Sequence, residues 1–212
     1  MRGKFITFEG SEGCGKSTQS RLLCAYLRSK GCDVLYLREP GATKISEKVR
    51  KVLLDKKNDA MSIECEMLLY MAARAQIVAE CIKPALEKGR MVICDRFLDS
   101  TIAYQGYGLG MDIGFIKSIG SFVTQGICPD LTILLDVPLK KGLKHRDGRQ
   151  DRIEQRSLSY HGRVRRGYFK LAKAEPSRIR IVKIQRDLHQ TQENIRMIIK
   201  NECSRARCHS PR

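Results

Sequence analysis

A short stretch near the start of the chain constrains the fold more than any other feature. Residues 10–17 read G-S-E-G-C-G-K-S, between an apolar run at 4–8 and a helical pattern at 16–30. At this spacing, glycines let backbone N–H groups surround phosphate oxygens, and the N-terminus of the following helix adds a positive end. Because a strand enters the loop and a helix leaves it, the stretch predicts an α/β fold that binds a nucleoside triphosphate.

The same motif predicts roles for its polar residues. We expect Lys16 to neutralise the β- and γ-phosphates and Ser17 to bind Mg²⁺. The predicted triphosphate-binding residues are Gly10, Ser11, Glu12, Gly13, Cys14, Gly15, Lys16, Ser17 and Thr18. Such loops occur in ATPases, GTPases and kinases alike, so this one does not identify the group that receives the phosphoryl group.

The rest of the chain alternates short apolar runs with helical patterns, which is typical of a parallel sheet flanked by helices. Strands are expected at 4–8, 33–37, 90–94, 131–137 and 179–184, and helices at 16–30, at 62–88 with a kink near Pro84, and after the last strand to about residue 202. We therefore predict a P-loop NTPase with a five-stranded parallel sheet. It would form one domain over residues 1–200, followed by a basic, disordered tail at 201–212.

Composition narrows the class of protein. Lys and Arg number 40 against 23 Asp and Glu, and the net charge of +17 indicates polyanionic partners such as nucleotides or nucleic acid. A nucleic-acid-stimulated ATPase is one alternative, but no nucleic-acid module signature is present and only 6% of residues are aromatic.

The longest apolar run, 67–73, is too short to span a membrane, and residues 1–9 lack the apolar region of a signal peptide. The nine cysteines occur singly, so we expect a cytoplasmic protein with reduced thiols and no membrane partner.

Four further stretches carry a family resemblance. They are LREPGAT at 37–43, DRFLDS at 95–100 followed by AYQG at 103–106, and DRIEQ at 151–155, together with FEGSEGCGKST at 8–18. With these stretches in the order that they have along the chain, the sequence resembles the thymidylate kinases, which are P-loop enzymes of the nucleoside monophosphate kinase type. The resemblance implies transfer of the γ-phosphoryl group of ATP to dTMP with Mg²⁺, and a homodimer. A related kinase with another monophosphate acceptor is the alternative.

The residues that would bind the acceptor phosphate follow an apolar strand. Asp95 and Arg96 come directly after residues 91–94, at the strand end where open α/β sheets bind ligands. The resemblance implies that Arg96 grips the acceptor phosphate and that Asp95 supports Mg²⁺ through water or orients Arg96. Near neutral pH a phosphate monoester is largely a dianion, so the reaction needs no general base.

The base and the sugar would be bound by other side chains. Tyr70 and Arg74 are four residues apart on one predicted helix and share a face, which suits a pyrimidine, although spacing alone favours a core Tyr and a surface Arg. The resemblance favours base binding, assigns Glu12 to the 3′-hydroxyl, and has Tyr104 crowd the 2′ position. The predicted substrate-binding residues are Glu12, Arg38, Pro40, Tyr70, Arg74, Arg96, Ser100, Thr101, Tyr104 and Gln105.

The polar, Arg-rich stretch at about 144–156 resembles the family's lid. Some members carry a catalytic Arg inside the phosphate loop, where this chain has Gly13, so the sequence resembles the bacterial type in which lid arginines act. Among the lid arginines we favour Arg149 and Arg152 over Arg146. The predicted catalytic residues are therefore Lys16, Arg96, Arg149 and Arg152.

Overall fold

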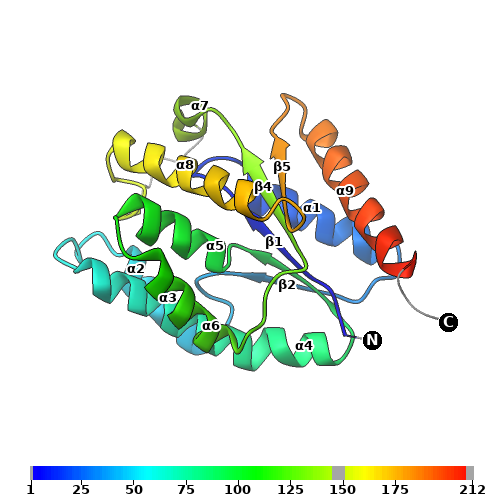
Figure 1. Cartoon of the computed structure of the whole chain (residues 1–212), viewed down its shortest axis with the longest axis horizontal. Helices are drawn as coiled ribbons and strands as arrows, with labels where there is room; N and C mark the ends of the chain where they lie inside the picture. Colours follow the sequence, from blue (N-terminus) through cyan, green and yellow to red (C-terminus); the bar gives the residue numbers. More distant parts are fainter. Residues whose placement is uncertain (1, 145–150, 209–212) are drawn as a thin grey trace.

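The computed structural model describes residues 2–144 and 151–208, and a five-stranded sheet lies at its centre (Figure 1). All neighbouring strands run parallel, in the order β2-β3-β1-β4-β5. The strands are β1 (Phe5–Glu9), β2 (Val34–Arg38), β3 (Met91–Asp95), β4 (Leu131–Asp136) and β5 (Ile179–Lys183). The predicted sheet is confirmed, and no strand boundary differs from the expected one by more than one residue.

The central strand β1 is buried along its whole length. Successive side chains of a strand point to opposite faces of the sheet. Accordingly Ile6 and Phe8 belong to the apolar core on one face, whereas Phe5 belongs to a core on the other. A strand that is covered on both faces has a continuous apolar sequence, which is why β1 could be recognised from its composition.

Two helices cover one face of the sheet, α1 (Lys16–Ser29) and α9 (Leu188–Cys208) (Figure 1). Leu23 of α1 and Ile195 of α9 are fully buried in the core that they form with the strands. α9 continues beyond the end expected near residue 202, into the segment predicted to be a disordered tail. Arg180 of β5 donates a hydrogen bond to Glu202 at 3.0 Å, which ties this part of the helix to the sheet.

The opposite face is covered by a larger group of helices. These are α3 (Ile63–Ile77), the π-helical turn η1 (Val78–Ile82), α4 (Lys83–Glu87), α5 (Leu98–Thr101), the π-helical turn η2 (Ile102–Gly108), α6 (Ile113–Thr124) and α8 (Leu158–Ala174). α2 (Lys44–Leu54) packs against α3, and α7 (Leu139–Lys144) follows β4. Together α3, η1 and α4 occupy the predicted 62–88 helix. The irregular turn η1 lies just before Pro84, because proline lacks the N–H that a regular helix needs there.

Across residues 2–144 and 151–208, none of the helices combines the length and the apolar character needed to cross a membrane.

Candidate active site

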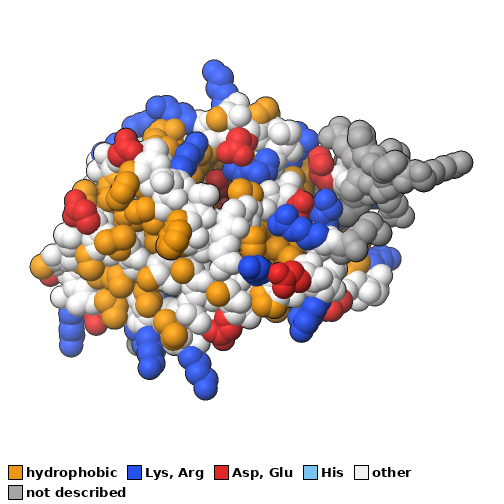
Figure 2. All heavy atoms as spheres, turned by 60° about the horizontal axis from the view of Figure 1, so that its bottom comes forward, with side chains coloured by type: hydrophobic (Ala, Val, Ile, Leu, Met, Phe, Trp, Pro, Cys, Tyr) orange, Lys and Arg blue, Asp and Glu red, His pale blue; other side chains and the backbone are white. Residues whose placement is uncertain are grey.

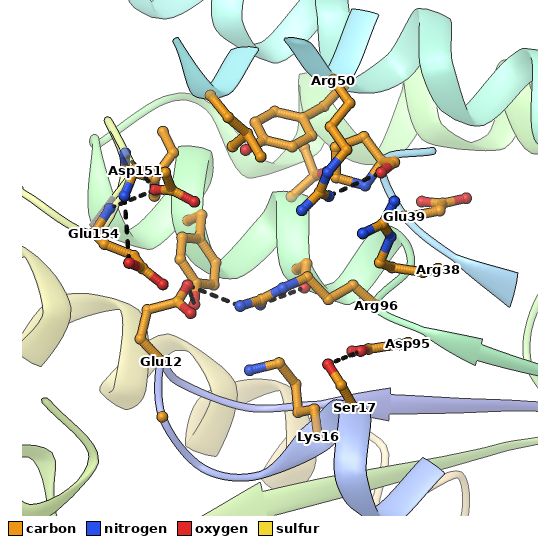
Figure 3. A pocket seen from close by; sticks show the side chains of 18 of the residues that line it. Glu12, Lys16, Ser17, Arg38, Glu39, Arg50, Asp95, Arg96, Asp151 and Glu154 are labelled. Atoms are coloured by element: carbon orange, nitrogen blue, oxygen red, sulfur yellow. Dashed lines mark hydrogen bonds and ion pairs between the residues drawn. The ribbon is translucent and has the colours of Figure 1, made fainter. Parts of the chain in front are cut away.

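A cavity of about 580 Å³ opens where β1, β2 and β3 end (Figure 3). The residues that line it are Glu12, Gly13, Gly15, Lys16, Ser17, Thr18, Arg38, Glu39, Pro40, Arg50, Leu54, Tyr70, Arg74, Asp95, Arg96, Ser100, Thr101, Tyr104, Gln105, Asp151, Ile153 and Glu154. Carboxyl ends of parallel strands are where α/β proteins bind ligands. All ten residues predicted to bind substrate meet in this cavity, although they come from distant parts of the chain.

The loop between β1 and α1 curls around one end of this cavity. The Lys16 ammonium group donates hydrogen bonds to the carbonyl oxygens of Gly10 at 3.0 Å and Ser11 at 2.8 Å, so it closes the loop on itself. Gly13 has a φ of +68°, and a Cβ there would lie 1.9 Å from the carbonyl oxygen of Gly142. No side chain fits at this position, so an Arg inside the loop, as in some thymidylate kinases, is incompatible with this backbone.

A second cavity, of about 290 Å³, shares Gly13 and Gly15 with the first. Its other lining residues include Cys14, Val137, Lys141 and Leu188. The phosphate loop thus lies between two cavities, and one face of it is available to each. This arrangement suits a ligand whose phosphates lie on the loop and whose remaining part extends away from the acceptor side.

Two side chains whose oxygen atoms could bind a metal ion meet beside the loop. Ser17 donates a hydrogen bond from its hydroxyl to the carboxylate of Asp95, which ends β3 (Figure 3). Hydroxyl and carboxylate oxygens are the hard ligands that Mg²⁺ prefers. The pair fits the predicted magnesium site, and both residues line the cavity.

Arg96 lies between the phosphate loop and the acceptor side of the cavity (Figure 3). Its guanidinium group donates to Glu12 at 2.8 Å and to Ser100 at 3.3 Å, and lies 5.0 Å from the centre of the Tyr104 ring. The Tyr104 hydroxyl donates to the same Glu12 oxygen at 2.8 Å. Burial raises the pKa of Glu12, but Arg96 and Lys16 outweigh burial and lower it to about 2, so this carboxylate is charged at neutral pH.

The backbone of Arg96 is held in an unusual conformation by a buried carboxylate. Arg96 has a φ of +73°, which is rare for a residue with a side chain. Glu9, at the end of β1, accepts hydrogen bonds from the backbone N–H of Phe97 at 2.7 Å, from the Ser100 hydroxyl at 2.6 Å and from the Tyr168 hydroxyl at 2.8 Å. Glu9 therefore fixes the residue that follows Arg96 in the chain, and it fixes Ser100, which accepts a hydrogen bond from the Arg96 guanidinium group.

Glu9 should make the stability of the protein depend on pH. Burial, and then the charge of Asp99, raise the pKa of Glu9 to about 7 despite the hydrogen bonds and Arg96. Between its unfolded pKa and about 7 the folded state therefore binds a proton that the unfolded chain has released, so stability falls as the pH rises through this window. We expect the free energy of unfolding to fall between about pH 5 and 7.5 by about 1–3 kcal/mol more in the wild type than in Glu9→Gln.

Urea denaturation of both proteins at the two pH values measures this difference. Glu39 also has a raised pKa, but it is present in both proteins, so its contribution cancels. Equal pH dependence of the wild type and Glu9→Gln would show that Glu9 is ionised in the folded state throughout the window.

The predicted base-binding pair lies on α3. Tyr70 is half-buried, Arg74 is almost fully buried, and both line the cavity from the one helix face that their spacing predicts. The Arg74 guanidinium group donates to Glu39 at 2.9 Å, to Thr101 at 3.0 Å and to the carbonyl oxygen of Phe97 at 3.0 Å. These contacts fix the orientation of Arg74 before any ligand arrives.

Arg38 ends β2, and Pro40 lies in the segment that follows this strand. Arg38 forms an ion pair with Glu47 at 2.9 Å, and Arg50 donates to the carbonyl oxygen of Pro40 at 2.9 Å (Figure 3). Both arginines line the cavity on the side away from the phosphate loop. They add positive charge to this side of the cavity.

The lid arginines differ in where they lie. Arg146 and Arg149 lie outside the described residues. Arg152 does not line the cavity, because its guanidinium group contacts Glu66 at 2.6 Å and the carbonyl oxygen of Leu53 at 3.0 Å. In this arrangement Arg152 holds the C-terminal part of the predicted lid against α2 and α3, and contact with a phosphate would require the pair with Glu66 to separate. The catalytic role of Arg149 and Arg152 stays a prediction.

Comparison with known proteins identifies the family. The family model for thymidylate kinase matches residues 8–195. The thymidylate kinase of Thermoanaerobacter sp. (strain X514) is 46% identical over 201 residues, covering 94% of this chain and 98% of that protein. The chain belongs to the thymidylate kinase family. The thymidylate kinase of Geotalea daltonii is 50% identical over 189 residues, covering 85% of this chain and 88% of that protein. A crystal structure of thymidylate kinase from Ehrlichia chaffeensis matches with a TM-score of 0.78 and 32% identity, covering 94% of this chain and all of that one.

Sequence reasoning about the thymidylate kinase site missed its buried carboxylates. Glu9, Glu39 and Glu66 each hold a residue that lines the cavity or lies beside it. One signal was available for Glu66, which lies four residues before Tyr70 and therefore on the same side of α3. For Glu9 the signal was a carboxylate at the end of a strand that is otherwise apolar.

Proposed function

We propose that the protein transfers the γ-phosphoryl group of ATP to dTMP, giving ADP and dTDP. The observation that carries this proposal is the single cavity that holds both the phosphate loop with Lys16 and the acceptor side with Tyr70 and Arg74. A donor phosphate on the loop and an acceptor phosphate near Arg96 would lie next to each other. The relatives named thymidylate kinase support this acceptor.

Charge and alignment perform the chemistry. Two polyanions must approach each other, and the side chains of Lys16 and Arg96 supply positive charge between them. The acceptor oxygen already carries negative charge at neutral pH, so attack on the γ-phosphorus needs no proton removal. Bond formation to the acceptor oxygen accompanies cleavage of the bond to the β-phosphate oxygen, and ADP leaves with that electron pair. Holding both nucleotides in line supplies much of the rate.

The acceptor's base and sugar would occupy the side of the cavity formed by α3, α5 and η2. We assign the pyrimidine ring to Tyr70, its O4 edge to Arg74, and its N3–H group to Gln105. We assign the sugar to Glu12 and Tyr104, which line the cavity together and are joined by a hydrogen bond of 2.8 Å from the Tyr104 hydroxyl. The remaining proposed contacts to the acceptor are Arg38, Pro40, Ser100 and Thr101.

The donor would use both cavities. Its triphosphate would lie on residues 10–18, and its adenosine part would enter the second cavity beside Cys14 and Val137. We assign Mg²⁺ to Ser17 and Asp95, with water completing its shell, and bound there the ion would neutralise phosphate charge. We keep Arg149 and Arg152 as the proposed lid arginines. We further propose a cytoplasmic location, where free thiols such as those of Cys32 and Cys65 stay reduced.

An ADP-release assay across dTMP, dUMP, dCMP, AMP and thymidine tests the proposed function. We expect the highest kcat/KM with dTMP and no phosphorylation of thymidine, which lacks the acceptor phosphate. Activity only with AMP or thymidine would overturn the acceptor assignment. ADP release without any monophosphate, stimulated by DNA or RNA, would instead favour the nucleic-acid-dependent ATPase.

We also propose that the protein forms a homodimer through an apolar face. Figure 2 shows hydrophobic side chains gathered on the side of the molecule that carries α2, α3 and α6. Phe122 of α6 is 82% exposed, and Phe115 of α6 and Leu68 of α3 are also more than half exposed. Side chains of this size are favoured at interfaces, and burying them removes apolar surface from water.

We expect Phe122→Glu to convert a dimer into monomers, because a charge would be buried in the centre of the contact. Sedimentation equilibrium of the wild type and the variant measures the change. The variant should keep its fold, since Phe122 makes little contact within the chain. A wild type that sediments as one chain at all concentrations would contradict the dimer.

A further inference from the structure

A fully buried carboxylate on α3 joins three parts of the molecule. Glu66 has 0% of its side chain exposed. One of its oxygens accepts from Arg152 and Arg156, each at 2.6 Å, and the other accepts from the side-chain amide nitrogen of Gln105 at 2.9 Å. Glu66 thus contacts η2 and the C-terminal part of the predicted lid from a position one helical turn before Tyr70.

This contact determines which way the Gln105 amide faces. A carboxylate paired with two guanidinium groups can only accept hydrogen bonds, so the amide of Gln105 must direct its N–H₂ group at Glu66. The carbonyl oxygen is then the group that the amide can offer to a ligand, and Gln105 lines the cavity. One oxygen of Glu66 therefore pairs with the two arginines, and the other oxygen orients the Gln105 amide.

The orientation of an amide distinguishes pyrimidines. At neutral pH the N3 atom of thymine carries a hydrogen and donates, whereas N3 of cytosine has a lone pair and accepts. A carbonyl oxygen accepts from the first and repels the second, and a buried polar group left without its partner is costly.

We propose that Glu66 is a positioning residue for base selection: it holds the Gln105 amide with its carbonyl oxygen toward the acceptor, and so favours thymine over cytosine. The proposal rests on the proposed function, because it assumes that a pyrimidine monophosphate occupies this cavity. Glu66 itself does not line the cavity and acts only through Gln105.

The substitution Glu66→Gln reverses this arrangement. The amide oxygen of the new side chain would accept from the arginines, and its N–H₂ group would face Gln105. The Gln105 amide would then turn its own oxygen toward position 66 and its N–H₂ group toward the ligand, which mismatches thymine N3–H and matches cytosine N3. Arg74 still favours a base with an oxygen at position 4, so we expect the preference for dTMP over dCMP to decrease but not to reverse.

The test compares two variants that share one change. Glu66→Gln alone would leave the buried Arg152 and the half-buried Arg156 without a counter-charge, which destabilises the fold. The double variant Glu66→Gln/Arg156→Gln keeps the wild-type net charge at this cluster, and Arg156→Gln alone is its matched control. The two proteins differ only at position 66, where Gln105 faces an amide in one and a carboxylate in the other.

We expect the ratio of kcat/KM for dTMP to that for dCMP to fall about 10- to 100-fold from the control to the double variant. Calorimetric Kd values for dTMP and dCMP give the same ratio if turnover is slow. Equal ratios in both variants would overturn the role of Glu66, whereas a wild type that does not phosphorylate dTMP would overturn the proposed function instead. A general loss of packing would lower both activities together and leave the ratio unchanged, which also counts against the proposal.

Discussion

We expect Arg96→Ala to lower kcat/KM for dTMP by about 10³-fold, because the variant loses a cation that stabilises phosphoryl transfer. The guanidinium group lies between Glu12 and Ser100, 2.8 and 3.3 Å away. Its removal takes positive charge from the acceptor phosphate and leaves the Glu12 carboxylate unpaired beside it. Two like charges would then face each other at the point where the transfer occurs. Initial rates of ADP release over a range of dTMP concentrations measure the loss.

Arg166→Ala is the matched control for this variant. Arg166 is an exposed arginine of α8 and does not line the cavity, so its loss changes the net charge by the same amount without touching the site. The control should stay close to the wild type. If Arg96→Ala were as active as Arg166→Ala, the assignment of the acceptor phosphate to Arg96 would be wrong.

We expect Lys16→Ala to lower activity about as much as Arg96→Ala does, but for a different reason. The Lys16 ammonium group is 2.8–3.0 Å from two carbonyl oxygens of the phosphate loop, and in the presence of ATP it would neutralise the phosphates on that loop. Without it we expect kcat/KM for ATP to fall by about 10³-fold, again because transition-state charge goes uncompensated. The carbonyl oxygens of Gly10 and Ser11 also lose the hydrogen bonds that the Lys16 ammonium group donates to them.

Substrate binding separates the two variants. In Lys16→Ala, dTMP should still bind, because Tyr70 and Arg74 are unchanged, whereas ATP binding should be lost. Arg96→Ala should show the opposite pattern. Calorimetry with each nucleotide alone measures both, and Lys88→Ala, an exposed lysine at the end of α4, serves as the control. Loss of dTMP binding in Lys16→Ala with ATP binding retained would contradict the assignment of donor and acceptor sides.

Local patterns predicted the fold well. The central strands β1, β3 and β4 are buried along most of their length, so they read as mainly apolar runs whose positions could be found without knowing their partners. The phosphate loop was predictable for a related reason, because its chemistry lies within one stretch of chain. Tyr70 and Arg74 were placed correctly on one face of a helix because helical spacing is also local.

Contacts between distant segments could not be predicted in the same way. Glu66 meets Arg156 across 90 positions of sequence, and Glu9 meets Tyr168 across 159. Nothing near these carboxylates in the sequence shows which partner they will find. Arg152 illustrates the consequence: its position in the predicted lid suggested contact with phosphate, but the structure pairs it with Glu66.

Transfer of a labelled phosphate tests the central claim most directly. With ATP carrying a radioactive γ-phosphate, dTMP and Mg²⁺, we expect the label to appear in dTDP, to depend on dTMP, and to disappear when EDTA removes the metal. Label released as inorganic phosphate at the same rate with and without dTMP would show that water is the acceptor and would contradict the account.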